Sequence, residues 1–153
     1  MAALAGEVDT VVHAGDIGSD EVLLQLQRHA ALVAVRGNND VPDKWRGGDS
    51  RLWALPREAA LELPGGRLVV VHGDRAGGAA GRHARLRRRH PGARTVVYGH
   101  SHRLTIDTGE PTWVLNPGAA GRNRTYGGPS CLILTAAAGP WQVQERRFEP
   151  LAK

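Results

Sequence analysis

Short β-branched runs carry most of the hydrophobic positions of this chain, and each run ends abruptly in a polar or glycine-containing segment. Such runs occupy residues 9–12, 32–35, 68–71, 95–98 and 113–115. Runs of this kind predict buried strands. Polar groups that follow strands directly collect at the carboxyl edge of an α/β sheet. The pattern therefore predicts five strands that present polar side chains at one rim.

The segments between and after these runs predict helices first and an antiparallel region later. Residues 19–30 predict a helix, because Ser19 or Asp20 can cap it and apolar positions repeat at helical spacing. A second helix is expected over 78–90. After residue 103, the runs at 104–107, 111–115, 130–135 and 141–148 predict an antiparallel meander. Two sheets with helices outside them are the expected packing.

Composition indicates a folded domain. The chain has 153 residues, of which 41% are hydrophobic and 23% charged, so it can bury a core and is not of the disordered class. We expect one domain over residues 1–153. No apolar run approaches the about 20 residues of a membrane span. The single cysteine, Cys131, and the lack of a visible secretory signal predict a cytoplasmic location and no membrane partner.

The net charge of +5 has two interpretations. Basic residues concentrate at 82–89, but no aromatic residues are interleaved with them, as a stacking platform for single strands would require. The simpler interpretation is a solvated helix face. The alternative is a flank that weakly attracts phosphate groups. We expect no nucleic-acid partner.

Five strand-end side chains form the candidate metal site: Asp16, Asn38, His72, His100 and His102. They combine a carboxylate, an amide oxygen and three imidazoles. Such a mixed oxygen and nitrogen set suits Mn, Fe, Co, Ni or Zn rather than calcium.

The order of these residues resembles that of a known family. Gly-Asp at 15–16, Gly-Asn at 37–38, His72 and Gly-His-Ser-His at 99–102 resemble the last four metal-binding blocks of the calcineurin-like metallophosphoesterases. The chain is most similar to their small prokaryotic phosphodiesterase branch, which also resembles the metallophosphoesterase-fold subunit of retromer. The resemblance implies a four-layer α/β/β/α sandwich.

The resemblance also implies roles for the site residues. Asp16 matches the carboxylate that bridges two divalent metal ions, with manganese expected first. Asn38, His72 and His100 match the other ligands of one ion, and His102 matches a ligand of the second. Asp16, Asn38 and His100 form the expected catalytic group. Two cations about 3.5–4 Å apart can clamp a phosphoryl group and activate a water molecule.

The implied function is metal-dependent hydrolysis of a phosphoester by metal-activated water. Asn39 stands where larger phosphatases of the family carry a histidine, and an amide cannot act as a general acid. This departure favours small-molecule phosphodiesters over monoesters as substrates. The sequence is compatible with a homo-oligomer and does not determine the oligomeric state.

A second departure from the family's pattern is larger than the one at Asn39. The family opens with an Asp-x-His block at the end of its first strand, and no such block precedes Asp16 here. We therefore expect the domain to be incomplete at its N-terminus, to lack its first strand and to bind one metal tightly. Two explanations account for the missing Asp-x-His block: residues upstream of this chain are missing, or the protein has truly lost one metal site. The alternative function is a catalytically weak or inactive metallophosphoesterase-fold scaffold that binds proteins.

Six further residues are candidates for supporting the metal ligands or contacting substrate: His13, Asp40, Asp74, Asn116, Arg122 and Arg124. Each also has a simpler interpretation. A packed histidine, a turn-capping carboxylate or a solvated arginine explains them equally well.

Overall fold

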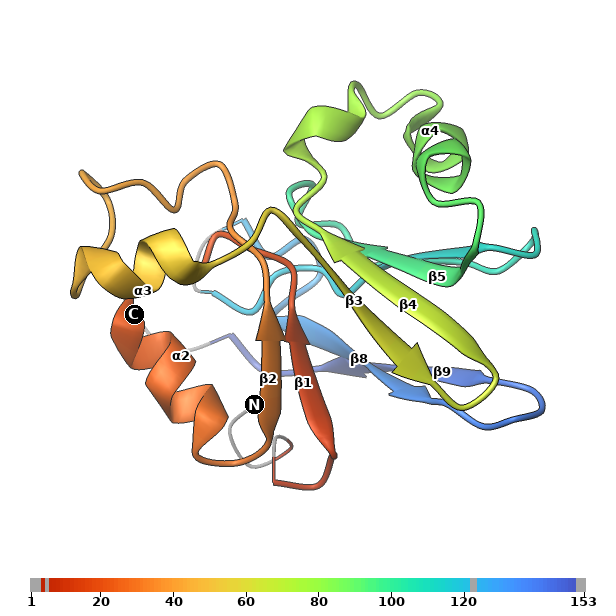
Figure 1. Cartoon of the computed structure of the whole chain (residues 1–153), viewed down its shortest axis with the longest axis horizontal. Coiled ribbons are helices and arrows are strands. Elements are labelled where there is room, and N and C mark those ends of the chain that lie inside the picture. The colour runs from red at the N-terminus through yellow and green to blue at the C-terminus, as the bar shows by residue number, and fades with distance from the viewer. Residues whose placement is uncertain (1–3, 5, 122–123, 151–153) are drawn as a thin grey trace.

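The computed structural model describes residues 4, 6–121 and 124–150, and it shows a mixed α/β fold. The strands are β1 (Thr10–His13), β2 (Ala31–Ala34), β3 (Glu58–Leu63), β4 (Gly66–Val71), β5 (Ala93–Tyr98), β6 (Thr105–Asp107), β7 (Trp113–Asn116), β8 (Ser130–Thr135) and β9 (Gln142–Arg147). The helices are α2 (Asp20–Gln27), α3 (Asp49–Ala54), α4 (Arg82–Arg89) and the 3₁₀ helix η1 (Asp74–Ala76). Figure 1 shows α2 and α3 on one side of the strands and α4 on the other.

The strands form three hydrogen-bonded groups. β1 and β2 pair in parallel, and β8 and β9 form an antiparallel hairpin. The largest sheet has the order β3-β4-β5-β7-β6, in which β4, β5 and β7 run parallel and the two edge strands are antiparallel to their neighbours. The carboxyl ends of β1, β2, β4 and β5 lead directly into the segments that carry the candidate ligands.

Three hydrophobic clusters fill the three interfaces of a four-layer sandwich. α2 and α3 pack on the outer face of β1 and β2 through Leu23 and Leu52. Val35 and Val70 represent the central cluster, in which β1 and β2 face β3, β4 and β5. On the far side, Leu86 of α4 packs against Val96 and the other apolar residues of the five-stranded sheet. The predicted α/β/β/α layering is confirmed.

The sequence-based predictions were wrong in three places. The predicted meander is two separate units, because β7 pairs in parallel with β5, whereas β8 and β9, within the described residues, pair with each other and with no other strand. The helix predicted over 78–90 begins at Arg82, because Gly77 and Gly81 take φ values of +75° and +71°, which interrupt a right-handed helix. β3 and α3 were not predicted.

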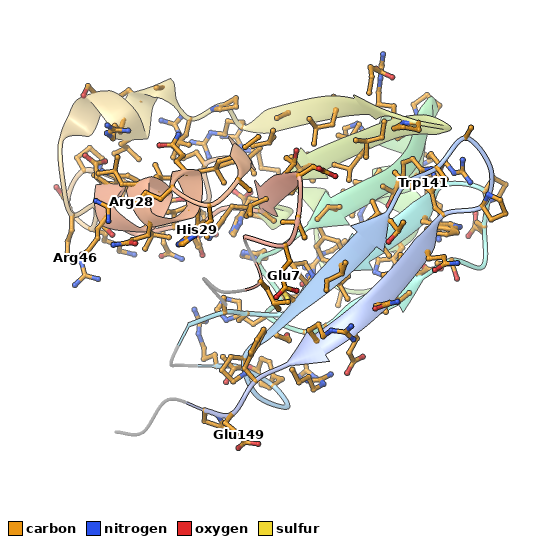
Figure 2. The ribbon with its side chains drawn as sticks, turned by 90° about the horizontal axis from the view of Figure 1, so that it is seen from below. Glu7, Arg28, His29, Arg46, Trp141 and Glu149 are labelled. Carbon is orange, nitrogen blue, oxygen red and sulfur yellow. The ribbon has the colours of Figure 1, made fainter. Side chains whose placement is uncertain are left out.

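Trp141 fixes the β8–β9 hairpin against the five-stranded sheet. Its indole N–H donates to the carbonyl oxygen of Pro64, at the β3–β4 turn, over 2.8 Å, and the Arg94 guanidinium lies 4.6 Å from its ring centroid. Figure 2 shows Trp141 near one end of the hairpin, while Arg28, His29 and Arg46 lie on the side of α2. In the part of the chain that the structure describes, no helix is long and apolar enough to cross a membrane.

Candidate metal centre

The backbone holds three of the predicted ligands in an uncommon conformation. Asp16, His100 and His102 each have φ of +58°, and among the described residues only Arg124 joins them as a non-glycine residue with positive φ. This left-handed conformation costs about 1–2 kcal/mol for a residue with a Cβ. Such local strain is concentrated at functional sites, where surrounding contacts hold it in place.

His72, at the end of β4, has its two ring nitrogens in different roles. The Nδ1 atom lies 2.7 Å from the carbonyl oxygen of Ala14, which can only accept a hydrogen bond. Nδ1 therefore carries the proton, and in the neutral ring Nε2 presents a lone pair. That lone pair faces the Asn38 Oδ1 atom at 2.9 Å and the Asp16 Oδ1 atom at 3.4 Å.

The arrangement of His72 Nε2, Asn38 Oδ1 and the Asp16 carboxylate is suited to binding a cation. His72 Nε2 in the neutral ring, Asn38 Oδ1 and the Asp16 carboxylate all offer lone pairs, so the three can share one cation. His100 Nδ1 lies 3.1 Å from the same Asn38 oxygen. Ligands about 2.1 Å from one ion are themselves about 3.0–3.4 Å apart, so the spacing of these atoms matches the edges of a coordination shell. The four side chains suit a borderline divalent metal.

Asp16 is oriented by Asn39. The Asn39 backbone N–H donates to Asp16 Oδ1 over 2.9 Å, and its side-chain Nδ2 donates to Oδ2 over 2.8 Å. Burial by itself would raise the pKa of Asp16, but the two hydrogen bonds from Asn39, with His72 and His100 nearby, outweigh it and lower the pKa. Asp16 is therefore an anion at neutral pH.

His100 is neutral under the same conditions. Its burial lowers the pKa of the ring, and the neighbouring His72 and Arg82 lower it further, against a smaller opposing effect of Asp74. The rings of His72 and His100 meet edge to face, with centroids 5.2 Å apart. Because only the neutral ring can bind a metal, the lowered pKa favours ligation.

Asp40 joins the two loops that carry Asp16 and Asn38. Its Oδ1 accepts from the backbone N–H groups of Ile17 and Gly18 at 2.8 and 2.9 Å, and its Oδ2 accepts from Gly37 at 2.8 Å. The carboxylate is 2% exposed. Asp40 therefore supports the ligands through the backbone.

Asn116, at the end of β7, supports the His100 loop in the same way. Its Nδ2 donates to the carbonyl oxygen of Gly99 over 2.7 Å and to Ser101 Oγ over 3.0 Å. Its Oδ1 accepts from the Gly118 N–H at 2.9 Å. Because Asn116 is fully buried, it positions the loop and cannot contact substrate.

His102 is not joined to the other predicted ligands. No hydrogen bond or ion pair links it to Asp16 in the described part of the chain. Its Nδ1 atom is buried and has no hydrogen-bond partner there. Across residues 4, 6–121 and 124–150, no three His, Cys, Asp or Glu side chains, Asp16, His72 and His100 included, are grouped closely enough to hold a metal by themselves. The amide oxygen of Asn38 is therefore central to the candidate site.

The remaining candidates are spread around this centre. His13 accepts a hydrogen bond from the Gly15 N–H over 3.2 Å, and its burial lowers its pKa although Asp40 opposes the shift. Asp74 begins η1 on the His100 side, where its charge acts on that ring. Arg124 is exposed. Arg122 lies outside the described residues.

Two residues near the centre were not predicted as site residues. Asn39 was considered only as a missing general acid, yet it fixes both oxygens of Asp16. Gly37 gives the room for this contact, since a Cβ there would collide with the Asp16 carboxylate and backbone. The Gly-Asn-Asn segment indicates a tight loop, but the partner of Asn39 is Asp16, which lies 23 residues earlier in the chain.

Comparisons with known proteins agree with one another. A family model described as the calcineurin-like phosphoesterase superfamily domain matches residues 1–139. A probable metallophosphoesterase of Methanocaldococcus jannaschii is 33% identical over 113 residues, which are 73% of this chain and 53% of that relative. One of Methanothermobacter thermautotrophicus is 28% identical over 115 residues, or 74% of this chain and 61% of the relative. The chain thus spans little more than half the length of these curated relatives.

Solved structures share the fold. A single-substitution variant of Vps29 from Entamoeba histolytica has a TM-score of 0.73 and 17% identity, over 97% of this chain and 88% of that one. A structure described as a novel archaeal phosphodiesterase has a TM-score of 0.68 and 22% identity, over 92% of this chain and 84% of that one.

Proposed function

Since this chain belongs to the calcineurin-like phosphoesterase superfamily, we propose that it hydrolyses small-molecule phosphodiesters with the help of a divalent metal. One observation carries the proposal: the lone pair of His72 Nε2 faces Asn38 Oδ1 at 2.9 Å, beside the Asp16 carboxylate. Three groups that can each offer a lone pair lie together here, and this arrangement supports a cation between them. The archaeal phosphodiesterase of similar fold supports the choice of diesters.

Asp16, Asn38, His72 and His100 would hold the metal. When bound, a divalent ion neutralises phosphate charge and lowers the pKa of a water molecule. Asp16 contributes the anionic charge, and Ala14 and Asn39 fix the orientation of His72 and Asp16. No side chain in the described part of this centre is placed as an acid for the leaving group, which favours diesters with good leaving groups.

Manganese is our first choice among the divalent metals, because carboxylate, amide and imidazole ligands together suit it. We place the protein in the cytoplasm, where the lone thiol of Cys131 stays reduced. Burial raises the pKa of this thiol, which makes it less reactive still.

The test is hydrolysis of bis(p-nitrophenyl) phosphate with manganese and with a chelator. We expect metal-dependent turnover that Asp16→Ala and the isosteric Asp16→Asn both reduce by about 100-fold or more, because each removes the anionic ligand. Asp43→Asn, an exposed carboxylate, is the matched control. Full activity in chelator, or wild-type activity in Asp16→Asn, would refute the mechanism.

A protein-binding scaffold is the second candidate. The specific observation in its favour is that, in the described structure, no hydrogen bond or ion pair joins His102 to the other predicted ligands. Metal binding without any diester hydrolysis, in wild-type protein that remains folded, would favour the scaffold over the enzyme.

A further inference from the structure

A cleft of about 320 Å³ lies beside the candidate metal centre, between the start of β3, the segment after β4 and the end of α4. Figure 1 shows these elements around one end of the five-stranded sheet. Four arginines line it: Arg36, Arg57, Arg75 and Arg89. His72 also lines it, so the cleft and the metal centre share one side chain.

The charge in this cleft is unbalanced. Only two carboxylates, Glu58 and Asp74, stand against the four guanidinium groups. Glu58 is exposed, and its Oε1 atom lies 3.7 Å from Nδ1 of His90. A concavity with an excess of one sign of charge attracts the opposite ion, although the exposure of Arg57, Arg75 and Arg89 lets solvent screen part of this field.

Several guanidinium N–H donors of these arginines have no hydrogen-bond partner in the described structure. The Nε atom of Arg36 is buried without a hydrogen-bond partner in the described structure, although its guanidinium is held 5.0 Å from the ring centroid of Trp53. Arg89 Nη1 donates to the carbonyl oxygen of Arg75 over 2.9 Å, which steadies that segment. Among the described residues, the structure shows no hydrogen bond or ion pair for the side chains of Arg57 and Arg75. A buried donor without an acceptor is unfavourable, so an acceptor is expected at Arg36 Nε, whereas the donors of the exposed Arg57 and Arg75 face solvent and can turn to an anion.

On the basis of the proposed function, we propose that this cleft binds a second phosphate group of the substrate. The substrate class is then a phosphodiester that carries a further phosphate away from the bond that is cleaved. A phosphate dianion offers several acceptor oxygens and can take paired hydrogen bonds from more than one arginine. A carboxylate has only two oxygens and would leave most of these donors unpaired.

The first experiment measures binding of inorganic phosphate by calorimetry in chelator, so that no metal contributes. We expect the double variant Arg57→Gln/Arg75→Gln to weaken binding at least tenfold. The matched control, Arg28→Gln/Arg46→Gln, changes two exposed arginines on the α2 side and should stay within twofold. Wild-type affinity in the cleft variant would overturn the proposal.

The second experiment separates a substrate phosphate from free phosphate. It compares binding of thymidylyl-thymidine with that of the same dinucleotide bearing a terminal phosphate. Wild-type protein should prefer the phosphorylated form at least tenfold, and the cleft variant should lose this preference. Lost phosphate binding with an unchanged preference would make the cleft a free-phosphate site and overturn its role in substrate choice. Both measurements are of binding, so a failure of diester hydrolysis would reject the proposed function separately.

Discussion

His72 and Ala14 are joined by a hydrogen bond of 2.7 Å from the ring Nδ1–H to the backbone carbonyl oxygen. Ala14 belongs to the segment after β1, and His72 follows β4, so the contact crosses from one sheet to the other. Its chemical effect is to select one tautomer of His72. The remaining nitrogen, Nε2, is then available to a metal at the point where Asp16 and Asn38 converge.

We predict that His72→Ala abolishes tight metal binding. Wild-type protein should bind about one divalent ion per chain, because His72 and His100 both lie beside Asn38 Oδ1 and His72 also faces Asp16, whereas the site without His72 should bind more weakly. The visible spectrum of added cobalt, and calorimetry with manganese, measure this. His29→Ala, an exposed histidine shown in Figure 2, is the control and should bind like wild type. Unchanged cobalt spectra in His72→Ala would contradict the site.

We predict that Asp40→Ala lowers the free energy of unfolding by about 3 kcal/mol, since it leaves three buried backbone N–H groups without their charged acceptor. Urea unfolding measures the change. Asp43→Ala removes an exposed carboxylate three residues later in the same segment and should change stability by less than about 0.5 kcal/mol. Equal stabilities of the two variants would rule out the loop-joining role of Asp40.

We predict that Gly37→Ala weakens metal binding at least tenfold, because the added Cβ collides with the Asp16 carboxylate and backbone and must displace them. A tenfold loss corresponds to about 1.4 kcal/mol, a modest cost for moving one ligand. Gly78→Ala is the control, since nothing lies within 4 Å of its added methyl group. Tight binding in Gly37→Ala would show that Asp16 does not need its present position.

We predict an acid-dependent contribution to stability from Asp107. Its carboxylate lies 2.8 Å from Arg87 Nη2 and 2.6 Å from His83 Nδ1, and the Arg87 guanidinium, more than His83, lowers the pKa of Asp107 despite its partial burial. A lowered folded-state pKa stabilises the fold above the unfolded value of about 3.9, and the stabilisation is lost as the pH falls through the folded value.

Asp107→Asn should therefore be less stable than wild type by about 1–2 kcal/mol near neutral pH, and the difference should shrink below about pH 4. Urea unfolding at both pH values tests this, with Asp43→Asn as the exposed control. A difference that grows on acidification would show that the sign of the shift is wrong.

The strands that end in the site could be predicted because they are buried and β-branched. β4 and β5 present unbroken apolar runs, and their polar ends follow at once. β3 could not be predicted. Its sequence, Glu-Ala-Ala-Leu-Glu-Leu, consists of good helix formers, and it becomes a strand only by pairing with β4 from Glu58↔Val71 to Leu63↔Gly66.

The sequence identified the candidate ligands and named Asp40 and Asn116 as candidate supports, but it identified neither Asn39 as a support nor the contacts that the supports make. Asp16 and His72 are strand-end residues, which the order of blocks identifies. The three acceptor contacts of Asp40 and the two donor contacts of Asn39 depend on loops that meet only in the folded chain. A sequence pattern gives the residue types near a site, but it does not give which backbone N–H groups a carboxylate will reach.

The core is divided into clusters, and this division affects which helices unfold locally together. β1 and β2, which lead to Asp16 and Asn38, pack with α2 and α3 through one cluster, while β4 and β5, which lead to His72 and His100, pack with α4 through another. A metal held by all four side chains would act as a crosslink between these two halves. This crosslink would add to the central cluster that already joins the halves, so amide hydrogens of α2 and α4 should exchange with solvent more slowly when metal is present than when it has been removed.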